Sequence, residues 1–303
     1  MKKIEMITVY LGSSGRSRPV FREAAERLGT LIGEHGKQLV YGGMDAGLMG
    51  LLANEALLAG AYVTGIIPKK LQDSQRIHQY LSETILVDDL WERKRKMFVQ
   101  ADAVIALPGG FGTLDESLEV LYWGKLKLHD KPLVLVNTEN YWADLIPYIK
   151  SLPDFDPRYL VTVDAPEEVF PALEDWSFAE EVLEIEEGFP HFEGDILRET
   201  EEPIILREAS IQNTYHFITA LGLKQLNKHQ RPMGILNPDG AFDGFIAWLG
   251  TAAREQFITD KCLLLFSVDT DEKKLDEKMA AQKPVKIDLH REKWGERREK
   301  PRG

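Results

Sequence analysis

Short apolar runs alternate with longer amphipathic stretches over the first 175 residues, and this rhythm limits the possible folds more than any other feature. Six runs have the length of buried strands: 6–11, 38–41, 62–67, 103–107, 132–136 and 159–163. Stretches of helical length lie between strands, as at 19–35, 89–100 and 141–152. Strands that alternate with helices form a parallel sheet covered by helices on both faces. The sequence therefore predicts an α/β fold with a doubly wound, Rossmann-like parallel sheet.

Charge and composition limit the partners of this chain. Its 303 residues include 37 Lys and Arg and 49 Asp and Glu, a formal net charge of −12 that repels the phosphates of nucleic acid. No apolar run reaches the roughly 18 residues of a membrane helix, and the first residues lack the apolar core of a signal peptide. The single Cys262 has no partner for an internal disulfide. We expect a cytoplasmic protein that binds neither nucleic acid nor membranes.

An acidic segment divides the chain. Residues 177–202 carry ten acidic residues and one basic residue, Arg198. Charge runs are usually solvated, so we interpret this segment as a linker, with a functional acidic tether as the alternative. The predicted organisation is a first α/β domain at 1–176, an acidic linker at 177–202, a partial α/β repeat at 203–283 and a charged tail at 284–303.

The repeat is visible as a match at an offset of 100 residues. Residues 101–152 align with 201–252 without a gap and share seven identities, and the strand-like run at 160–164 recurs at 265–269. Matched patterns of this kind predict the same supersecondary units twice, although two unrelated α/β segments could align by chance. The second copy lacks the glycine-rich turns of the first and has His216 at the position of Glu116.

Three glycine-rich turns follow predicted strands of the first domain. They are G-S-S-G at 12–15, G-G at 42–43 with Gly47 and Gly50, and P-G-G-F-G-T at 108–113. Glycine lets the backbone approach an anion, and a helix that starts there offers unpaired N–H groups. None of the turns is a dinucleotide fingerprint or a P-loop, and each by itself could be an ordinary tight turn. Together, at the carboxyl ends of parallel strands, they predict a site for a phosphate-bearing small molecule.

Charged residues flank the third turn. Asp115, Glu116 and Glu119 follow it on the predicted helix, where acidic side chains are often only favourable partners of the helix dipole. The run E-R-K-R-K at 92–96 lies one helix earlier, and such a run is usually a solvated face. An arginine of this run could instead reach the phosphate, because its planar fork suits bidentate binding.

These motifs resemble those of a known family. E-R-K at 92–94, P-G-G-F-G-T-L-D-E at 108–116, G-G at 42–43 with G-L-M-G at 47–50, G-I-I-P at 65–68 and H-D-K-P at 129–132 are similar to the signatures of the LONELY GUY (LOG) family. Members of this family are cytokinin riboside 5′-monophosphate phosphoribohydrolases, long labelled as lysine decarboxylases. The resemblance covers about residues 5–175 and identifies the first domain as a nucleotide-binding catalytic domain.

The resemblance implies roles for individual residues. Arg93 and Glu116 take the places of the catalytic pair, and the residues implied to hold the substrate are Lys94, Gly109, Gly110, Gly112 and Thr113. From the other glycine turns we add four candidate substrate-binding residues: Gly12, Ser13, Gly42 and Gly43. Two positions depart from the family pattern, since Met44 replaces a third glycine and Gln75 lies where an acidic residue is usual.

The implied reaction is hydrolysis of the N-glycosidic bond of a purine nucleoside 5′-monophosphate, of cytokinin type or AMP, to free base and ribose 5-phosphate. The resemblance implies no cofactor and a homodimer, and we expect no metal because the seven His lack ligand spacing. The main alternative is a non-catalytic carrier of a nucleotide or of the molybdenum cofactor. Lysine decarboxylation is disfavoured because no lysine has a recognisable cofactor context, and a dehydrogenase because the dinucleotide fingerprint is missing. We hypothesise that the repeat packs on the first domain as a pseudo-partner or extends its core.

Overall fold

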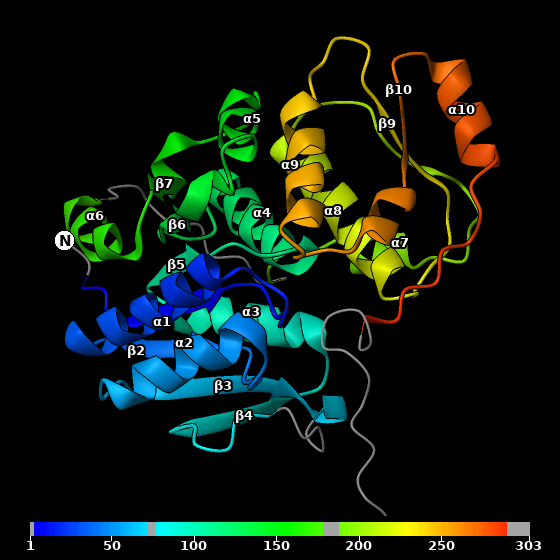
Figure 1. Cartoon of the computed structure of the whole chain (residues 1–303). Helices are drawn as coiled ribbons and strands as arrows, with labels where there is room; N and C mark the ends of the chain where they lie inside the picture. The colour runs from blue at the N-terminus through cyan, green and yellow to red at the C-terminus, as the bar shows by residue number, and fades with distance from the viewer. Residues whose placement is uncertain (1–2, 72–76, 178–187, 290–303) are drawn as a thin grey trace, which may run out of the picture.

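A seven-stranded parallel sheet organises the first half of the chain (Figure 1). The computed structural model describes residues 3–71, 77–177 and 188–289. The strands are β1 (Met6–Tyr10), β2 (Gln38–Tyr41), β3 (Val63–Pro68), β4 (Glu83–Val87), β5 (Ala103–Ala106), β6 (Leu133–Val136) and β7 (Leu160–Val163). They lie in the order β4-β3-β2-β1-β5-β6-β7, and every pairing is parallel. The chain therefore winds in two directions from a switch point between β1 and β5, which confirms the predicted doubly wound fold.

Helices connect these strands and cover the sheet. They are α1 (Pro19–Glu34), α2 (Gly47–Leu58), α3 (Leu90–Gln100), α4 (Phe111–Lys125), α5 (Leu145–Ser151) and α6 (Val169–Asp175). Every residue of β5 and β6 is buried, as expected for strands with helices on both faces. No helix among the described residues is long and apolar enough to cross a membrane.

The sequence did not reveal β4. This strand pairs with β3 at the edge of the sheet, and four of its five residues are at least partly exposed. A strand with one wet face and a free edge does not need a continuous apolar run, so its sequence gave no signal.

The repeat forms a second, three-stranded parallel layer with its own helices. Its strands are β8 (Ile204–Leu206), β9 (Met233–Leu236) and β10 (Ser267–Asp269), in the order β10-β9-β8. Its helices are α8 (Ile211–Gln225), α9 (Asp243–Arg254) and α10 (Glu272–Ala280), and a short helix, α7 (Glu193–Ile196), precedes it. In Figure 1, α4 and α8 lie side by side between the two sheets.

Backbone and hydrogen bonds repeat at the same offset as the sequence. Val104 pairs with Leu133 in β5–β6, and Ile204 pairs with Met233 in β8–β9. His129 bonds the carbonyl of Val120 at 2.8 Å, and His229 bonds that of Ala220 at 2.9 Å. The helices α4 and α8 also begin and end 100 residues apart, at 111–125 and 211–225. The match at 100 residues is thus accompanied by matching strand pairs, helix bounds and hydrogen bonds, which favours a repeat over chance alignment.

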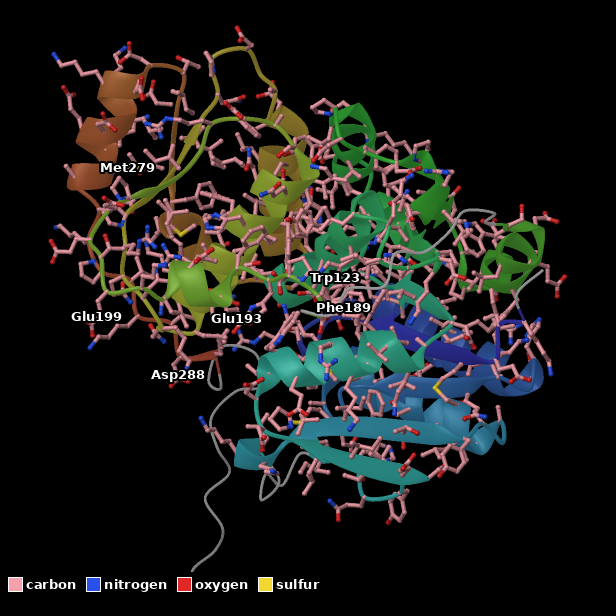
Figure 2. The ribbon with its side chains drawn as sticks, turned by 180° about the vertical axis from the view of Figure 1, so that it is seen from behind. Trp123, Phe189, Glu193, Glu199, Met279 and Asp288 are labelled. Atoms are coloured by element: carbon pink, nitrogen blue, oxygen red, sulfur yellow. The ribbon has the colours of Figure 1, made fainter. Side chains whose placement is uncertain are left out.

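Part of the predicted linker is packed against the first half rather than solvated. Trp123 of α4 donates its indole N–H to the carbonyl of Pro190 at 2.9 Å, and its ring centroid lies 4.6 Å from that of Phe189 (Figure 2). Ile196 of α7 is fully buried. The apolar residues among the acidic ones provide this packing. The prediction of a solvated linker considered only the charge of the segment and so missed them. Residues 178–187 lie outside the described part of the chain.

The predicted tail also begins with packed residues. Ile287 is buried, and its backbone N–H and C=O bond the side-chain amide of Asn227 at the end of α8. Residues 284–289 therefore continue the repeat, and 290–303 lie outside the described residues.

Glycine at position 29 allows α1 and α2 to approach closely, and its substitution is expected to destabilise the fold. A Cβ on Gly29 would lie 2.4 Å from the carbonyl oxygen of Leu52. We expect Gly29→Ala to lower the free energy of unfolding by about 1–3 kcal/mol through overpacking. Gly222 is also inside a helix but has no atom within 4 Å of a built Cβ, so Gly222→Ala should raise stability by up to about 1 kcal/mol. Urea unfolding of both variants measures the contrast, and equal effects would contradict the assigned packing.

Candidate active site

The loops after β1, β2 and β5 meet at one edge of the sheet, beside the switch point. The backbone N–H of Gly12 donates to the carbonyl of Pro108 at 3.1 Å, which joins the first and third glycine turns. A Cβ on Gly47 would lie 2.6 Å from the carbonyl of Ser13, so the start of α2 rests on the first turn. This edge is where open α/β sheets bind ligands.

Helix α3 presents Arg93 to this edge because its N-terminus is fixed by reciprocal capping. The Asp89 carboxylate accepts from the N–H of Glu92 at 2.8 Å, and the Glu92 carboxylate accepts from the N–H of Asp88 at 2.7 Å. Such paired caps satisfy donors that the first turn of a helix leaves open. Glu92 of the E-R-K motif thus orients the helix rather than facing the ligand edge.

Arg93 reaches both a glycine turn and the acid of α4. A Cβ on Gly42 would lie 3.0 Å from Nη2 of Arg93, so glycine makes room for the guanidinium there. The same Nη2 lies 3.8 Å from Oε1 of Glu116. The proposed catalytic pair is therefore brought together from α3 and α4, and its side chains are 18% and 11% exposed.

The Glu116 carboxylate is protonated more readily than an ordinary glutamate. Burial raises its pKa to about 7, and the positive charges of Arg93 and Lys94 only partly oppose this. A carboxyl that titrates near neutrality can accept or release a proton at physiological pH, as general acid–base groups do.

Polar atoms at this edge lack partners within the protein. Among the described residues, Nε of Arg93 and the hydroxyl of Tyr10 are buried without a hydrogen bond. Burial raises the pKa of Tyr10 well above its usual value, and the charge of Glu116 adds to the rise. A buried polar group without a partner costs about 1–3 kcal/mol, so these atoms favour a ligand or ordered water at the site. Tyr10 was not predicted, but a polar aromatic residue two positions before Gly12, in an apolar strand, is a signal that could have found it.

The glycines of the third turn differ in how much space a side chain would have at each position. A Cβ on Gly109 would lie 2.1 Å from Oγ1 of Thr113, and one on Gly110 would lie 2.7 Å from the carbonyl of Phe257, which belongs to the repeat. Gly112 is exposed and has no atom within 4 Å of a built Cβ. Gly109 and Gly110 are thus required by packing, whereas Gly112 leaves space in front of the helix.

The N-terminus of α4 keeps its backbone donors available, unlike that of α8. The N-cap of α4 is Gly110, which has no side chain to accept from the first turn. At the equivalent position of α8, Ser210 accepts from the N–H of Asn213 at 3.0 Å, and Asp154 accepts from that of Ile211 at 2.7 Å. Free N–H groups at a helix N-terminus bind anions. The start of α4 therefore remains the candidate anion site, whereas the start of α8 is capped by side chains.

Lys94 points away from the glycine turns. Its ammonium lies 2.9 Å from Asp115 and 3.1 Å from Glu119, both on α4. Burial alone would lower the pKa of Lys94, but these carboxylates raise it well above its usual value. Two hydroxyls from α8 complete the cluster, with Tyr215 donating to Glu119 and Thr219 donating to Asp115. We refer to Lys94, Asp115, Glu119, Tyr215 and Thr219 as the α4–α8 network. This position favours a structural role for Lys94 over the direct substrate contact that the sequence indicated.

The two departures from the family pattern have different outcomes. Met44 forms an isolated bridge with Ile77, and the carbonyl of Gly43 accepts from the N–H of His78 at 3.1 Å. Gly43 itself has a φ of +71°, which favours glycine. Met44 therefore helps to fasten the segment that returns from β3. Gln75 lies outside the described residues.

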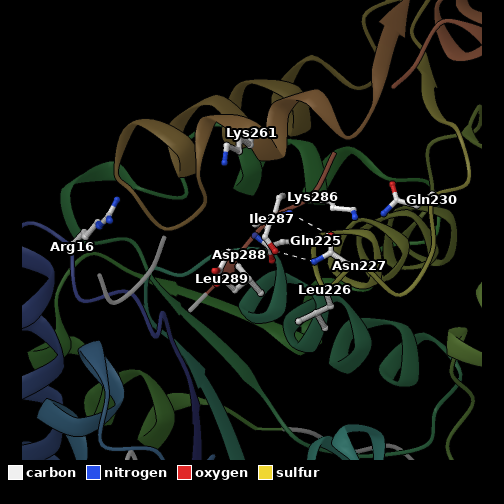
Figure 3. A pocket seen from close by; sticks show the side chains of 10 residues that line it. All are labelled: Arg16, Gln225, Leu226, Asn227, Gln230, Lys261, Lys286, Ile287, Asp288 and Leu289. Atoms are coloured by element: carbon white, nitrogen blue, oxygen red, sulfur yellow. Dashed lines mark hydrogen bonds between the residues drawn. The ribbon is translucent and has the colours of Figure 1, made fainter. Parts of the chain in front are cut away.

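A separate cavity of about 940 Å³ lies beside the repeat (Figure 3). It is lined by Arg16, Gln225, Leu226, Asn227, Gln230, Lys261, Lys286, Ile287, Asp288 and Leu289. Its charged side chains are exposed, and neither Arg93 nor Glu116 lines it. We place the candidate active site at the Arg93–Glu116 pair because that site combines buried charge with unpartnered polar atoms.

Fold and site together define a doubly wound α/β protein with glycine-rich turns at one sheet edge and a buried acid beside an arginine. A family model described as "possible lysine decarboxylase" matches residues 49–173. A cytokinin riboside 5′-monophosphate phosphoribohydrolase of Arabidopsis thaliana is 41% identical over 152 residues, which are 50% of this chain and 70% of the relative. A probable enzyme of the same name from Oryza sativa subsp. japonica is 37% identical over 174 residues, 55% of this chain and 82% of the relative.

Among solved structures, the molybdenum cofactor binding protein of Rippkaea orientalis is 22% identical and superimposes with a TM-score of 0.46 over 57% of this chain and 98% of that chain.

The two plant relatives show the family of this chain. The chain belongs to the family of cytokinin riboside 5′-monophosphate phosphoribohydrolases, the LONELY GUY family that its motifs resemble.

The raised pKa of Glu116 predicts how stability depends on pH. A carboxyl whose pKa is about 7 in the folded protein, against 4.5 ordinarily, favours folding when protonated, so its contribution to stability is lost as pH rises from 4.5 through 7. Glu116→Gln cannot ionise. The melting temperature of this variant, relative to wild type, should therefore rise between pH 5 and pH 8.

Thermal melts at both pH values test this dependence. Glu23→Gln, at an exposed position on α1, is the control, and its difference from wild type should change little. A pH-independent difference for Glu116→Gln would contradict the assigned environment.

Proposed function

We propose that this protein hydrolyses the N-glycosidic bond of a purine nucleoside 5′-monophosphate, releasing the free base and ribose 5-phosphate. The observation that carries the proposal is the pairing of Arg93 with buried Glu116 beside the uncapped N-terminus of α4. Membership of the phosphoribohydrolase family supports it.

The chemistry requires a negative charge near the sugar. As the base departs, positive charge builds on the ribose, and a carboxylate stabilises it much as in glycoside hydrolysis. Ionised Glu116 supplies this charge and can accept a proton from the water that attacks the anomeric carbon. The bond to the base breaks with its electron pair on the base nitrogen, which then takes up a proton.

The phosphate and the base need separate contacts. Glycine turns and the first N–H groups of α4 suit the 5′-phosphate, with Gly12, Ser13, Gly42, Gly43 and Gly112 at that edge. Arg93 binds either the phosphate or the departing base. The Tyr10 hydroxyl, unpartnered and under the influence of the Glu116 charge, is available to orient the water.

Lysine decarboxylation does not suit these residues, despite the description of the matching family model. A Schiff-base lysine needs an uncharged amine, whereas the ammonium of Lys94 is buried between two carboxylates that stabilise its charge. Lys94 is thus kept protonated.

Three properties remain predictions. The family resemblance predicts a homo-oligomer, which the mass of the purified protein in solution tests, and no cofactor. The composition of the sequence predicts a cytoplasmic location.

Base release from nucleotides is the direct test of the proposed reaction. Purified protein is incubated with a panel that includes AMP and N6-substituted AMP analogues, and free base and ribose 5-phosphate are measured. We expect turnover of at least one nucleotide, and Glu116→Gln should lower kcat by about 10²-fold or more. Ser117→Ala, the next residue of α4, is the matched control. Tight nucleotide binding without base release would instead identify a carrier, and near-native turnover by Glu116→Gln would end the catalytic assignment.

Gly112→Ala separates nucleotide binding from folding. The new methyl group enters the open space before α4, where we place the phosphate, without meeting another atom of the protein. We expect KM for the nucleotide to rise about tenfold or more, an effect of about 1.4 kcal/mol, with the melting temperature nearly unchanged. Gly250→Ala on α9 also meets no atom and is the control. An unaltered KM in Gly112→Ala would place the phosphate elsewhere.

A further inference from the structure

Contacts between the two copies are reciprocal. At the offset of 100 residues, position 215 matches 115 and position 219 matches 119. Asp115 bonds Thr219 and Glu119 bonds Tyr215, so position 115 of each copy contacts position 119 of the other. A second set follows the same rule, given by the ring pairs Trp142–Trp248 at 5.8 Å and Tyr148–Phe242 at 6.4 Å.

Such reciprocity is the mark of a two-fold interface. When residue i of one copy meets residue j of the other, and j of the first meets i of the second, the copies are related by a two-fold axis. In this chain α4 packs on α8 and α5 packs on α9. The C-terminal repeat therefore occupies, on the face formed by α4 and α5, the place that a second copy of the first half would take in a dimer.

The substitutions between the copies change what meets across this interface. Two identical α4 helices would bring Asp115 and Glu119 of one copy against the same carboxylates of the other, and like charges repel. The repeat has Tyr215 and Thr219 at these positions, and both donate hydrogen bonds to the carboxylates they face. Donors to a buried carboxylate stabilise its ionised form, so the repeat replaces a repulsion by two charge-assisted bonds.

Other charged groups face the network from the segment before the repeat. Glu193 of α7, labelled in Figure 2, is close enough for Lys94 to lower its pKa, although burial raises it overall. His191 has a lowered pKa, through burial and then through the charge of Lys94. Lys94 therefore interacts electrostatically with His191 and Glu193 as well as with the carboxylates of α4.

The repeat also contacts the glycine turns directly. The ring of Phe257 would lie 2.5 Å from a Cβ on Gly12, and its carbonyl limits Gly110. The same ring packs edge-on against Tyr141, at 5.0 Å, and the Tyr141 hydroxyl donates to the carbonyl of Gly109 at 2.5 Å. The repeat thus supports both sides of the anion site.

We propose that the C-terminal repeat is an internal partner that completes the active site, with Tyr215 and Thr219 as positioning residues. They hold Asp115 and Glu119, and through them Lys94 and the helical turn that carries Glu116. One chain then contains a complete site without a second copy on the α4 face. The effect on catalysis rests on the proposed function, whereas the effect on the carboxylates does not.

Three variants of the full chain test the proposal. Tyr215→Phe and Thr219→Val each remove one hydroxyl from the network at nearly constant shape. Tyr148→Phe removes an equally buried hydroxyl between the halves, which bonds Thr214 at 2.6 Å but touches no carboxylate. Each variant should lower the melting temperature by about 2–4 °C for its lost hydrogen bond.

The readouts beyond stability separate positioning from packing. Carbon-13 NMR of labelled glutamate should show the Glu119 titration moving up by about 0.5–1 pH unit in Tyr215→Phe and not in Tyr148→Phe. With a nucleotide substrate, kcat should fall about tenfold or more in Tyr215→Phe and Thr219→Val at similar KM, and stay near wild type in Tyr148→Phe. Equal Glu119 titrations in all proteins, or equal losses of kcat in all three variants, would overturn the proposal. If wild type released no base from any nucleotide, the proposed function would fail, while the NMR titration would still decide the role of Tyr215.

Discussion

The structure depends on how three carboxylates of α4, two of them buried and one partly buried, are accommodated near the start of that helix. Burying a charge is costly unless the charge is paired and hydrogen-bonded. Asp115 and Glu119 share the ammonium of Lys94, and each accepts a hydroxyl from α8. Glu116, between them in sequence, has among the described residues one longer ion pair, to Arg93 at 3.8 Å. Burial raises the pKa of both Glu116 and Glu119 to about 7, so the two differ in position rather than in titration. Glu119 is held by Lys94 and Tyr215, whereas Glu116 lies beside Arg93.

The two copies of the α/β unit have the same backbone arrangement but differ at the N-termini of α4 and α8. In α4 the N-cap glycine leaves backbone donors unpaired and faces the ligand edge, whereas in α8 Ser210 and Asp154 satisfy those donors. An anion site and a closed, self-capped helix therefore differ by a few side chains at matched positions. Loss of the glycine turn in the repeat is consistent with a supporting role, since its helix packs on α4 instead of binding a ligand.

Sequence reasoning succeeded where local pattern and tertiary structure agree. The strands β1, β2, β3, β5, β6 and β7 are apolar because helices cover both faces of the sheet, so their runs were visible. It failed at β4, an exposed edge strand, and at Phe189 and Ile196, whose packing was hidden within a segment that looks solvated by charge. Lys94 was assigned to the substrate from its motif, but the direction of its side chain depends on helices α4 and α8, which are distant in sequence.

The sequence by itself determined the doubly wound sheet, the three glycine turns at its edge, the repeat at 100 residues and the motifs that carry Arg93 and Glu116. Strand length, glycine placement and motif spacing are written within short windows of the chain, and the repeat is visible by comparing two such windows 100 residues apart. Only the tertiary structure decided which carboxylates are neutralised, that Tyr10 lies at the site, and that the repeat meets α4 through reciprocal contacts. Burial and charge compensation arise between different helices, and the two-fold packing joins residues about 100 positions apart, so no local pattern encodes the distance or the direction of such contacts.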